Sequence, residues 1–183
     1  MIFRIRFTGV KFLVTGWSDG PSLPEPRKLH CAAQIDDNRI LLAGGITKGT
    51  ISKITKSTVL VDLNTRNTRN VGNLTKERKN HACALFKNNV YLVASGETEI
   101  FDLGTENWTS GETLPGQISG SGSLAEYQNE LFYSDEDNFY KLGNEGWKPI
   151  YEVKNVKSRK NYTPLSIVVL DSNSHDDNPC VFV

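Results

Sequence analysis

The stretch Arg78–Trp108, RKNHACALFKNNVYLVASGETEIFDLGTENW, decides the fold. It contains four short apolar runs, and Asn, Gly and Asp residues separate them. Runs of this length rich in Val, Tyr, Phe and Leu, with such residues between them, predict four β-strands joined by tight turns. A sheet of this size cannot bury both of its faces alone. The stretch therefore requires copies of itself elsewhere in the chain.

Parts of the same pattern recur on both sides of this stretch. Arg27 and His30 lie 51 positions before its first Arg and His, and Asn129 lies 40 positions after Asn89. A further start, Arg159–Tyr162, keeps the spacing of three between Arg and an aromatic residue. A period of about 40–50 residues with four strands per unit is typical of a β-propeller. The sequence predicts an all-β chain.

The recurring residues resemble the kelch repeat. They comprise Leu-Pro before an Arg, a His three residues later, a Gly-Gly after the second strand, a Val-Asp or Phe-Asp in the third and a Trp in the fourth. The likeness runs from about Trp17 to Trp108; in the third repeat Ile118, Ser121 and Ser134-Asp135 replace the Arg, His and Gly-Gly. The resemblance implies a kelch-type propeller and an architectural role for the repeated positions, which are Arg27, His30, Gly44, Gly45, Arg78, His81, Gly96, Trp108 and Trp147.

A catalytic role for the repeated Arg and His residues would require a nucleophile or a metal beside them. Their recurrence at one repeat position instead predicts that each forms hydrogen bonds to the backbone between neighbouring blades.

The chain is predicted to be one domain, residues 1–183. We expect full blades at about 27–71, 78–109 and 118–148, and partial blades at 1–17 and 159–183. Propellers usually close with about four to eight blades. Either the two ends combine into a fourth blade, or the chain is an open arc, which we favour. An open arc exposes apolar faces and strand edges, so self-association or pairing with another chain would follow.

Composition restricts the classes of function. Lys and Arg number 21 and Asp and Glu number 21, so no global field attracts nucleic acid or anionic lipid. The aromatic residues lie in predicted strands, which argues against nucleic-acid binding. No apolar run of about 20 residues exists, so we expect no membrane span.

Three cysteines, Cys31, Cys83 and Cys180, give an odd count without close pairs. This argues against a disulfide framework and predicts a reducing, cytoplasmic location. We expect Cys31 and Cys83 to be small buried residues on the first strands of their blades. Sequons at Asn73, Asn107 and Asn161 support secretion only weakly.

Loop length indicates where a partner would bind. Gly45 and Asp62 are 17 positions apart, whereas Gly96 and Asp102 are 6 apart. The first repeat therefore contains an insertion, Ile46–Thr58, between its second and third strands. Insertions on one face of a repeat array commonly mark the binding side.

We expect this face to be basic over most blades and acidic over the third, and to bind an acidic peptide segment of a protein partner. The alternative is a loop whose lysines only interact with solvent. The candidate partner-binding residues are Lys28, Lys48, Lys53, Lys56, Lys79, Asn80, Asp135 and Asp137.

Motifs for chemistry are weak. No His/Cys set has zinc-ligand spacing, and His175-Asp176-Asp177 near Cys180 is better explained as a polar loop. No nucleophile elbow and no phosphate-binding loop is present. We expect no cofactor, no metal and no catalysis, and a role as a kelch-repeat scaffold or adaptor. The alternative is a propeller enzyme of carbohydrate-handling or oxidase type, because some kelch-like propellers are enzymes. The Tyr, His and Cys set of copper oxidases cannot be placed here.

Overall fold

The computed structural model describes residues 19–48, 52–118, 122–135 and 138–152. The predicted partial blades 1–17 and 159–183 lie outside these residues. The described part contains fifteen β-strands and no helix, which confirms the all-β prediction. It accordingly contains no helix long and apolar enough to cross a membrane.

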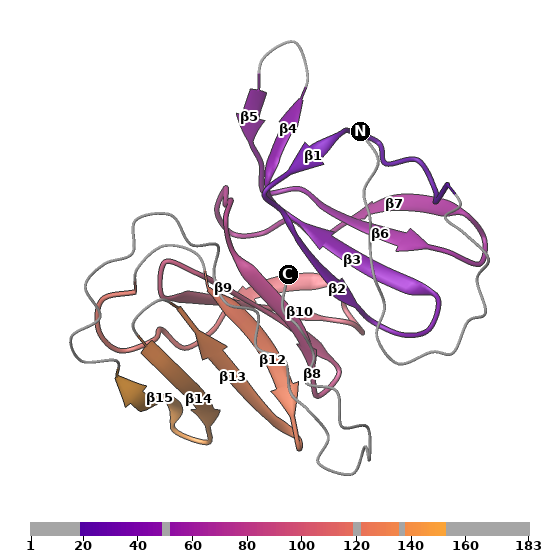
Figure 1. Ribbon diagram of the computed structural model, residues 1–183. Helices are drawn as coiled ribbons and strands as arrows, with labels where there is room; N and C mark the ends of the chain where they lie inside the picture. The colour runs from indigo at the N-terminus through magenta and orange to yellow at the C-terminus, as the bar shows by residue number, and fades with distance from the viewer. Residues whose placement is uncertain (1–18, 49–51, 119–121, 136–137, 153–183) are drawn as a thin grey trace, which may run out of the picture.

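Twelve strands form three four-stranded antiparallel sheets, here called blades 1, 2 and 3 (Figure 1). Blade 1 contains β2 (Cys31–Gln34), β3 (Arg39–Ala43), β6 (Thr58–Asp62) and β7 (Asn67–Val71). Blade 2 contains β8 (Ala82–Phe86), β9 (Asn89–Ala94), β10 (Glu97–Asp102) and β11 (Asn107–Ser110). Blade 3 contains β12 (Ser123–Tyr127), β13 (Glu130–Ser134), β14 (Asn138–Gly143) and β15 (Gly146–Glu152).

In each blade the four strands are paired in chain order, as the sequence predicts. Short polar residues form the turns. Lys87 and Asn88, between β8 and β9, have φ angles of 47° and 64°. Two consecutive left-handed residues are the geometry of the tightest hairpins. Between β10 and β11, the Asp102 carboxylate accepts hydrogen bonds from the backbone N–H groups of Gly104 (3.0 Å) and Thr105 (2.7 Å).

The blades lie against one another through their first strands and their faces. β2 packs beside β8, and β8 packs beside β12. Ile40–Ala43 and Val90–Ala94 belong to separate sheets, and neither strand extends the other. The three sheets are therefore stacked as successive units, like the blades of a propeller.

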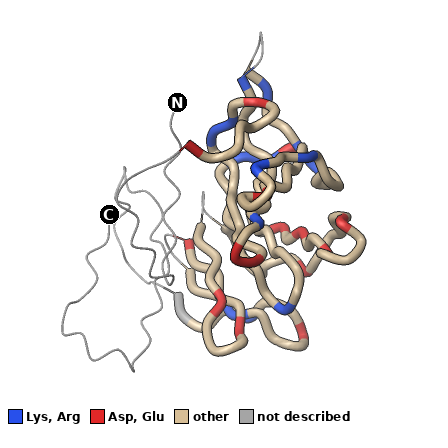
Figure 2. The backbone as a smooth tube through the Cα atoms, turned by 90° about the vertical axis from the view of Figure 1, so that its right-hand side faces the viewer, with Lys and Arg blue, Asp and Glu red and all other residues tan. Residues whose placement is uncertain are grey.

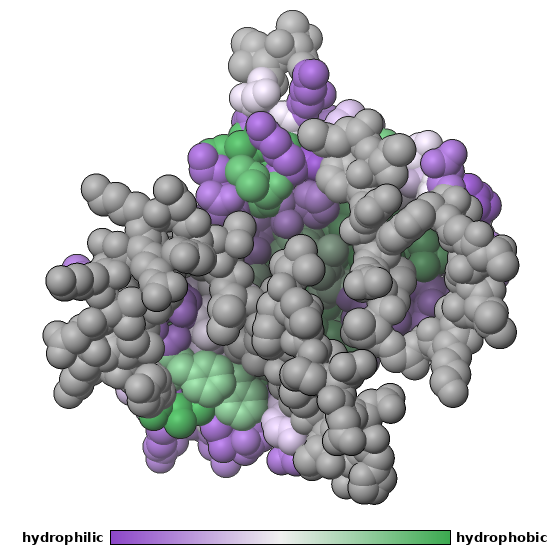
Figure 3. Space-filling view, in the orientation of Figure 1, coloured by the Kyte–Doolittle hydropathy of each residue, from purple (hydrophilic) through white to green (hydrophobic). Residues whose placement is uncertain are grey.

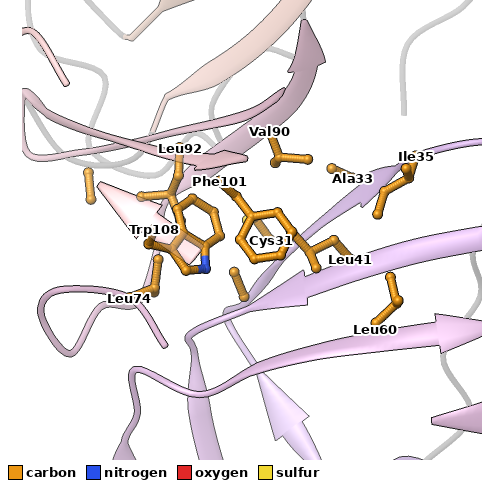
Figure 4. Packing of buried hydrophobic residues seen from close by; sticks show 12 residues of the cluster. Cys31, Ala33, Ile35, Leu41, Leu60, Leu74, Val90, Leu92, Phe101 and Trp108 are labelled. Atoms are coloured by element: carbon orange, nitrogen blue, oxygen red, sulfur yellow. The ribbon is translucent and has the colours of Figure 1, made fainter. Parts of the chain in front are cut away.

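Two hydrophobic cores fill the spaces between blades. The core between blades 1 and 2 includes Leu41, Leu60, Val90, Leu92, Phe101 and Trp108 (Figure 4). The core between blades 2 and 3 includes Phe86, Val93, Leu131, Tyr133, Tyr140 and Trp147. A third cluster, on the other face of blade 1, includes Ile40, Leu42, Val59 and Val61, against which Leu23 packs. Burial of apolar area of this kind is the dominant favourable term in folding.

The predicted insertion in the first repeat forms a small sheet of its own. β1 (Arg27–Lys28) pairs with β4 (Ile46–Lys48), which pairs with β5 (Ser52–Ile54). β4 and β5 lie between β3 and β6 in the chain, where the sequence predicts the insertion. The insertion ends at residue 57, because Thr58 already begins β6. Figure 1 shows β4 and β5 projecting from the body of the blades.

Cys31 and Cys83 lie on the first strands of their blades, as predicted, but the prediction against a disulfide is wrong. Cys31 on β2 and Cys83 on β8 form a disulfide, 52 residues apart in sequence. A separation close to one repeat places both on the first strands of successive blades, and these strands are nearest neighbours. Distance along the chain therefore says little about which cysteines meet. The cysteine argument for a cytoplasmic location no longer holds, and the location stays a prediction.

Candidate interaction surface

The small sheet β1–β4–β5 fixes the positions of three of the predicted lysines. Lys28 on β1 lies opposite Ile46, and on the neighbouring pair Lys48 lies opposite Ser52 and Lys53 opposite Thr47. All three lysine side chains are exposed, whereas Thr47 is buried. The short strands therefore bury Thr47 and its partner Arg27, and they leave the lysines in solvent.

The connection between blades 1 and 2, residues 75–80, lies against this sheet. The Asn80 N–H donates to the Leu29 carbonyl over 3.0 Å, and the Gly45 N–H donates to the Arg78 carbonyl over 2.7 Å. The Arg78 N–H in turn donates to the Thr55 carbonyl over 3.3 Å. These bonds bring the predicted residues on the connection next to those on the hairpin.

Six of the eight predicted partner-binding residues thus lie in one region, and all six are exposed. We call this region the basic edge: Lys28, Lys48, Lys53, Lys56, Lys79 and Asn80. Figure 2 shows Lys and Arg residues concentrated around the projecting hairpin.

Carboxylates neutralise part of the predicted positive charge. Lys53 pairs with Glu77 (3.5 Å), and Lys76 pairs with Glu97 (2.6 Å). Four residues of the basic edge, Lys28, Lys48, Lys56 and Lys79, make no ion pair with any described carboxylate. The basic charge is therefore carried by these four side chains and is weaker than the sequence predicts.

Arg78 is not a surface charge. Its guanidinium contacts Glu99 (2.5 Å) and Glu97 (2.7 Å), and its side chain is 9% exposed. The Glu99 carboxylate also accepts a hydrogen bond from the Thr75 N–H (2.6 Å). Burial acts to lower the pKa of Arg78, and the hydrogen bonds to Glu97 and Glu99 outweigh it, so the pKa lies above the usual arginine value. Sequence reasoning missed these two glutamates. The one sequence feature that points to them is the Glu-Thr-Glu order at the start of β10, which places both glutamates on the same side of the strand.

Contrary to the prediction, the side chains of the repeated arginines form bonds within their own repeats, although the Arg78 backbone bonds to Gly45 and Thr55 of the preceding repeat. Arg27 donates to the carbonyl groups of Gly44 (3.2 Å) and Ser57 (3.1 Å) and to the Ser57 hydroxyl (3.1 Å), all within its own repeat. Arg78 likewise contacts β10 of its own blade. In each repeat the arginine precedes the first strand of the blade. Its side chain reaches the junction of the second and third strands of that blade, because this junction lies beside it.

His81 fulfils the prediction that Arg27 and Arg78 do not. Its Nε2 lies 3.0 Å from the carbonyl oxygen of Ala43, the last residue of β3 in the preceding blade. Burial lowers the pKa of His81. Burial, followed by the charges of Arg27 and His81, lowers the pKa of His30 to about 4. Both imidazoles are therefore neutral at pH 7.

Close backbone approach explains the double glycine. Gly44 and Gly45 have φ angles of 60° and 94°. A Cβ on Gly45 would lie 2.6 Å from the Lys28 carbonyl oxygen, so no side chain fits there without displacing β1. Gly96, at φ 81°, is the single glycine at the corresponding turn of blade 2.

The two repeated tryptophans connect neighbouring blades. The Trp108 indole N–H donates to the Thr58 hydroxyl of blade 1 over 3.0 Å, and the Trp147 indole N–H donates to the Thr98 hydroxyl of blade 2 over 3.0 Å. Both indoles are buried.

The predicted acidic residues are separate from the basic edge. Asp135 follows β13 in blade 3, where its carboxylate accepts a hydrogen bond from the Asn138 N–H (2.8 Å). Asp137 lies outside the described residues. Asp135 therefore shapes a turn, and the structure does not place it with the lysines.

A groove of about 410 Å³ lies between the outer turns of blades 2 and 3. Its lining includes Phe86, Tyr91 and the Lys141–Glu130 ion pair (2.5 Å). Within the described ranges, no group of three or more His, Cys, Asp or Glu side chains is placed to hold a metal ion.

Comparison with known proteins supports the fold. No family model matches the sequence, and no curated protein matches it. A solved structure titled "Structure of YjhT", a propeller, matches with a TM-score of 0.68 at 12% identity, over 77% of this chain and 57% of that one. The chain thus spans little more than half of that protein's length. At this identity the likeness concerns the fold alone, and it confirms the predicted propeller architecture.

Proposed function

We propose that this chain is a non-catalytic protein-interaction module, and that the basic edge binds an acidic peptide segment of its partner. The observation that carries the proposal is the projecting β4–β5 hairpin, an insertion between β3 and β6 that gathers exposed lysines beside β1 and residues 75–80. None of the described residues of this insertion belongs to a core between blades, which supports a binding role.

The electrostatics of the basic edge favour an acidic ligand. Four of its lysines make no ion pair with a described carboxylate, so a ligand carboxylate meets available charge. The Lys53–Glu77 pair is exposed, with side chains 74% and 50% accessible. Exposed pairs contribute little stability, so a ligand can replace Glu77 at low cost. Charge complementarity of this kind orients a partner and raises its association rate.

The test is a charge-reversal experiment. The Lys48→Glu/Lys53→Glu/Lys56→Glu variant and the unchanged chain are titrated with a fluorescent peptide of alternating Glu and Gly. We expect the variant to lose at least tenfold in affinity, and the unchanged chain to bind more weakly as salt rises, since screening acts on exposed charges.

A matched control carries the same change in net charge elsewhere. Lys87, Lys141 and Lys148 lie on blades 2 and 3, away from the hairpin sheet. The corresponding triple Glu variant should bind the peptide as the unchanged chain does. Equal loss in both variants would mean that net charge and not the basic edge determines binding, and unchanged binding in the hairpin variant would exclude the proposal.

A further inference from the structure

Blade 3 carries apolar side chains on the face that points away from blade 2. Leu131 and Tyr133 on β13 point into the core with blade 2, so Phe132 between them points to the opposite face. There Phe132 stacks on Phe139 of β14, with ring centroids 5.6 Å apart and planes 7° from parallel. Figure 3 shows an apolar patch at the lower left, over the strands labelled β13 and β14 in Figure 1.

Strand register shows that this face corresponds to a blade-packing face. In blade 2 one row across the sheet is Ala84, Tyr91 and Ile100. In blade 3 the same row, 41 residues later, is Ala125, Phe132 and Lys141. The blade 2 face packs against blade 3, with Tyr91 and Ala84 beside that core. Blade 3 therefore presents, at matching positions, the surface on which a following blade would pack.

Several positions of this face differ, among them Lys141 for Ile100, Ser134 for Val93 and Phe139 for Thr98. Thr98 of blade 2 lies beside Val93 and accepts the hydrogen bond of Trp147 from the following blade. The matching position of blade 3, beside Ser134, is Phe139. Phe139 has no hydroxyl, so the hydrogen bond between Trp147 and Thr98 has no equivalent at this position.

We propose that residues 159–183 of this chain cover the Phe132/Phe139 face as the beginning of a further blade. This segment starts with Arg159–Tyr162, which repeats the spacing of Arg78–His81, and continues with the apolar run Leu165–Leu170. Residues 159–183 follow blade 3 in the chain as blade 3 follows blade 2, whereas residues 1–17 precede blade 1.

Hydrogen–deuterium exchange of the full chain tests the proposal. Peptides from residues 162–170 should be protected in the unchanged chain, and Phe132→Asp/Phe139→Asp should raise their exchange rate at least tenfold. Leu29→Asp is the control, because Leu29 is an apolar side chain that is 46% exposed and lies between β1 and β2, away from blade 3. It should leave the exchange of 162–170 unchanged. Unprotected peptides in the unchanged chain would overturn the proposal.

A second measurement covers the case in which the double variant unfolds blade 3. A benzophenone amino acid at position 132 is photolysed, and the crosslinked peptides are identified by mass spectrometry. Crosslinks to residues 159–183 within a single chain support the proposal. Crosslinks to residues 1–17, or the absence of crosslinks to 159–183, would overturn it. Crosslinks between two chains would also overturn it and would indicate that a second copy covers this face.

Discussion

Trp147 of blade 3 and Thr98 of blade 2 share a buried hydrogen bond of 3.0 Å across the boundary between two sheets. Trp108 and Thr58 repeat it one blade earlier. Each tryptophan lies on the fourth strand of its blade and each threonine on the third strand of the preceding blade. The recurrent tryptophan therefore attaches one blade to the next, which explains why it recurs once per repeat.

Removal of one of these indoles should weaken the corresponding blade boundary. We expect Trp147→Phe to lower the free energy of unfolding by about 1–3 kcal/mol, since it leaves the buried Thr98 hydroxyl without its donor and creates a small cavity. Urea denaturation followed by circular dichroism measures the change. In a double-mutant cycle with Thr98→Val, a coupling energy of about 0.5–1.5 kcal/mol is expected. Additive single effects would contradict the bond's role.

The Arg78–Glu99 pair should contribute far more than the surface pairs. Its two side chains are 9% and 1% exposed. We expect Glu99→Ala to destabilise the chain by about 3–5 kcal/mol, because it leaves a buried guanidinium with one fewer partner. Lys148→Ala, which breaks a Lys–Glu pair with side chains 60% and 81% exposed, is the control and should cost less than about 1 kcal/mol. Equal midpoints of thermal unfolding in the two variants would refute this difference.

Reduction of the disulfide should destabilise the boundary between blades 1 and 2. The Cys31–Cys83 bond closes a loop of 52 residues, for which the chain-entropy estimate is at most about 4 kcal/mol. We expect the Cys31→Ala/Cys83→Ala variant to unfold at a lower temperature than the oxidised chain, and a reductant to have no further effect on it. If thiol titration of the folded chain finds two free thiols in addition to Cys180, the disulfide does not form.

Acid should destabilise the fold before the carboxylates titrate. The pKa of His30 is lowered to about 4, and burial lowers that of His81 too. A lowered histidine pKa means that the unfolded chain binds the proton more tightly, so the stabilisation is complete above about pH 6.5 and decreases as the pH falls toward 4. Denaturation midpoints measured from pH 7.5 to 4.5 should stay level down to about pH 6.5 and then fall. The His30→Asn variant should show a shallower slope, and an unchanged slope would contradict the assignment to His30.

The sequence predicted the strands of each blade well, because residues close together in the chain determine each hairpin. Asn88, Asp102 and the apolar runs between them specify hairpins within a few residues of one another, and the structure has strands at each of these places. The disulfide escaped prediction for the opposite reason. Cys31 and Cys83 meet only because two first strands are adjacent in space, and strand propensity contains no information about such a neighbour.

The placement of the candidate binding residues was predicted in part. The insertion is visible as an excess of residues between Gly45 and Asp62, so its lysines could be assigned to one face. Glu97 and Glu99 were missed because a charge inside a strand does not reveal which side chain it meets. A partner-binding role for Asp135 stays a prediction; its carboxylate accepts the Asn138 N–H, a local bond that the sequence alone does not reveal.

The covalent bond between β2 and β8 has a consequence for the integrity of the chain. Every peptide bond from residue 31 to residue 83 lies within the ring that Cys31 and Cys83 close. A protease that cuts the projecting hairpin would therefore leave two fragments that stay covalently linked until a reductant cleaves the disulfide. Under oxidising conditions a cleaved β4–β5 hairpin would therefore not release either fragment.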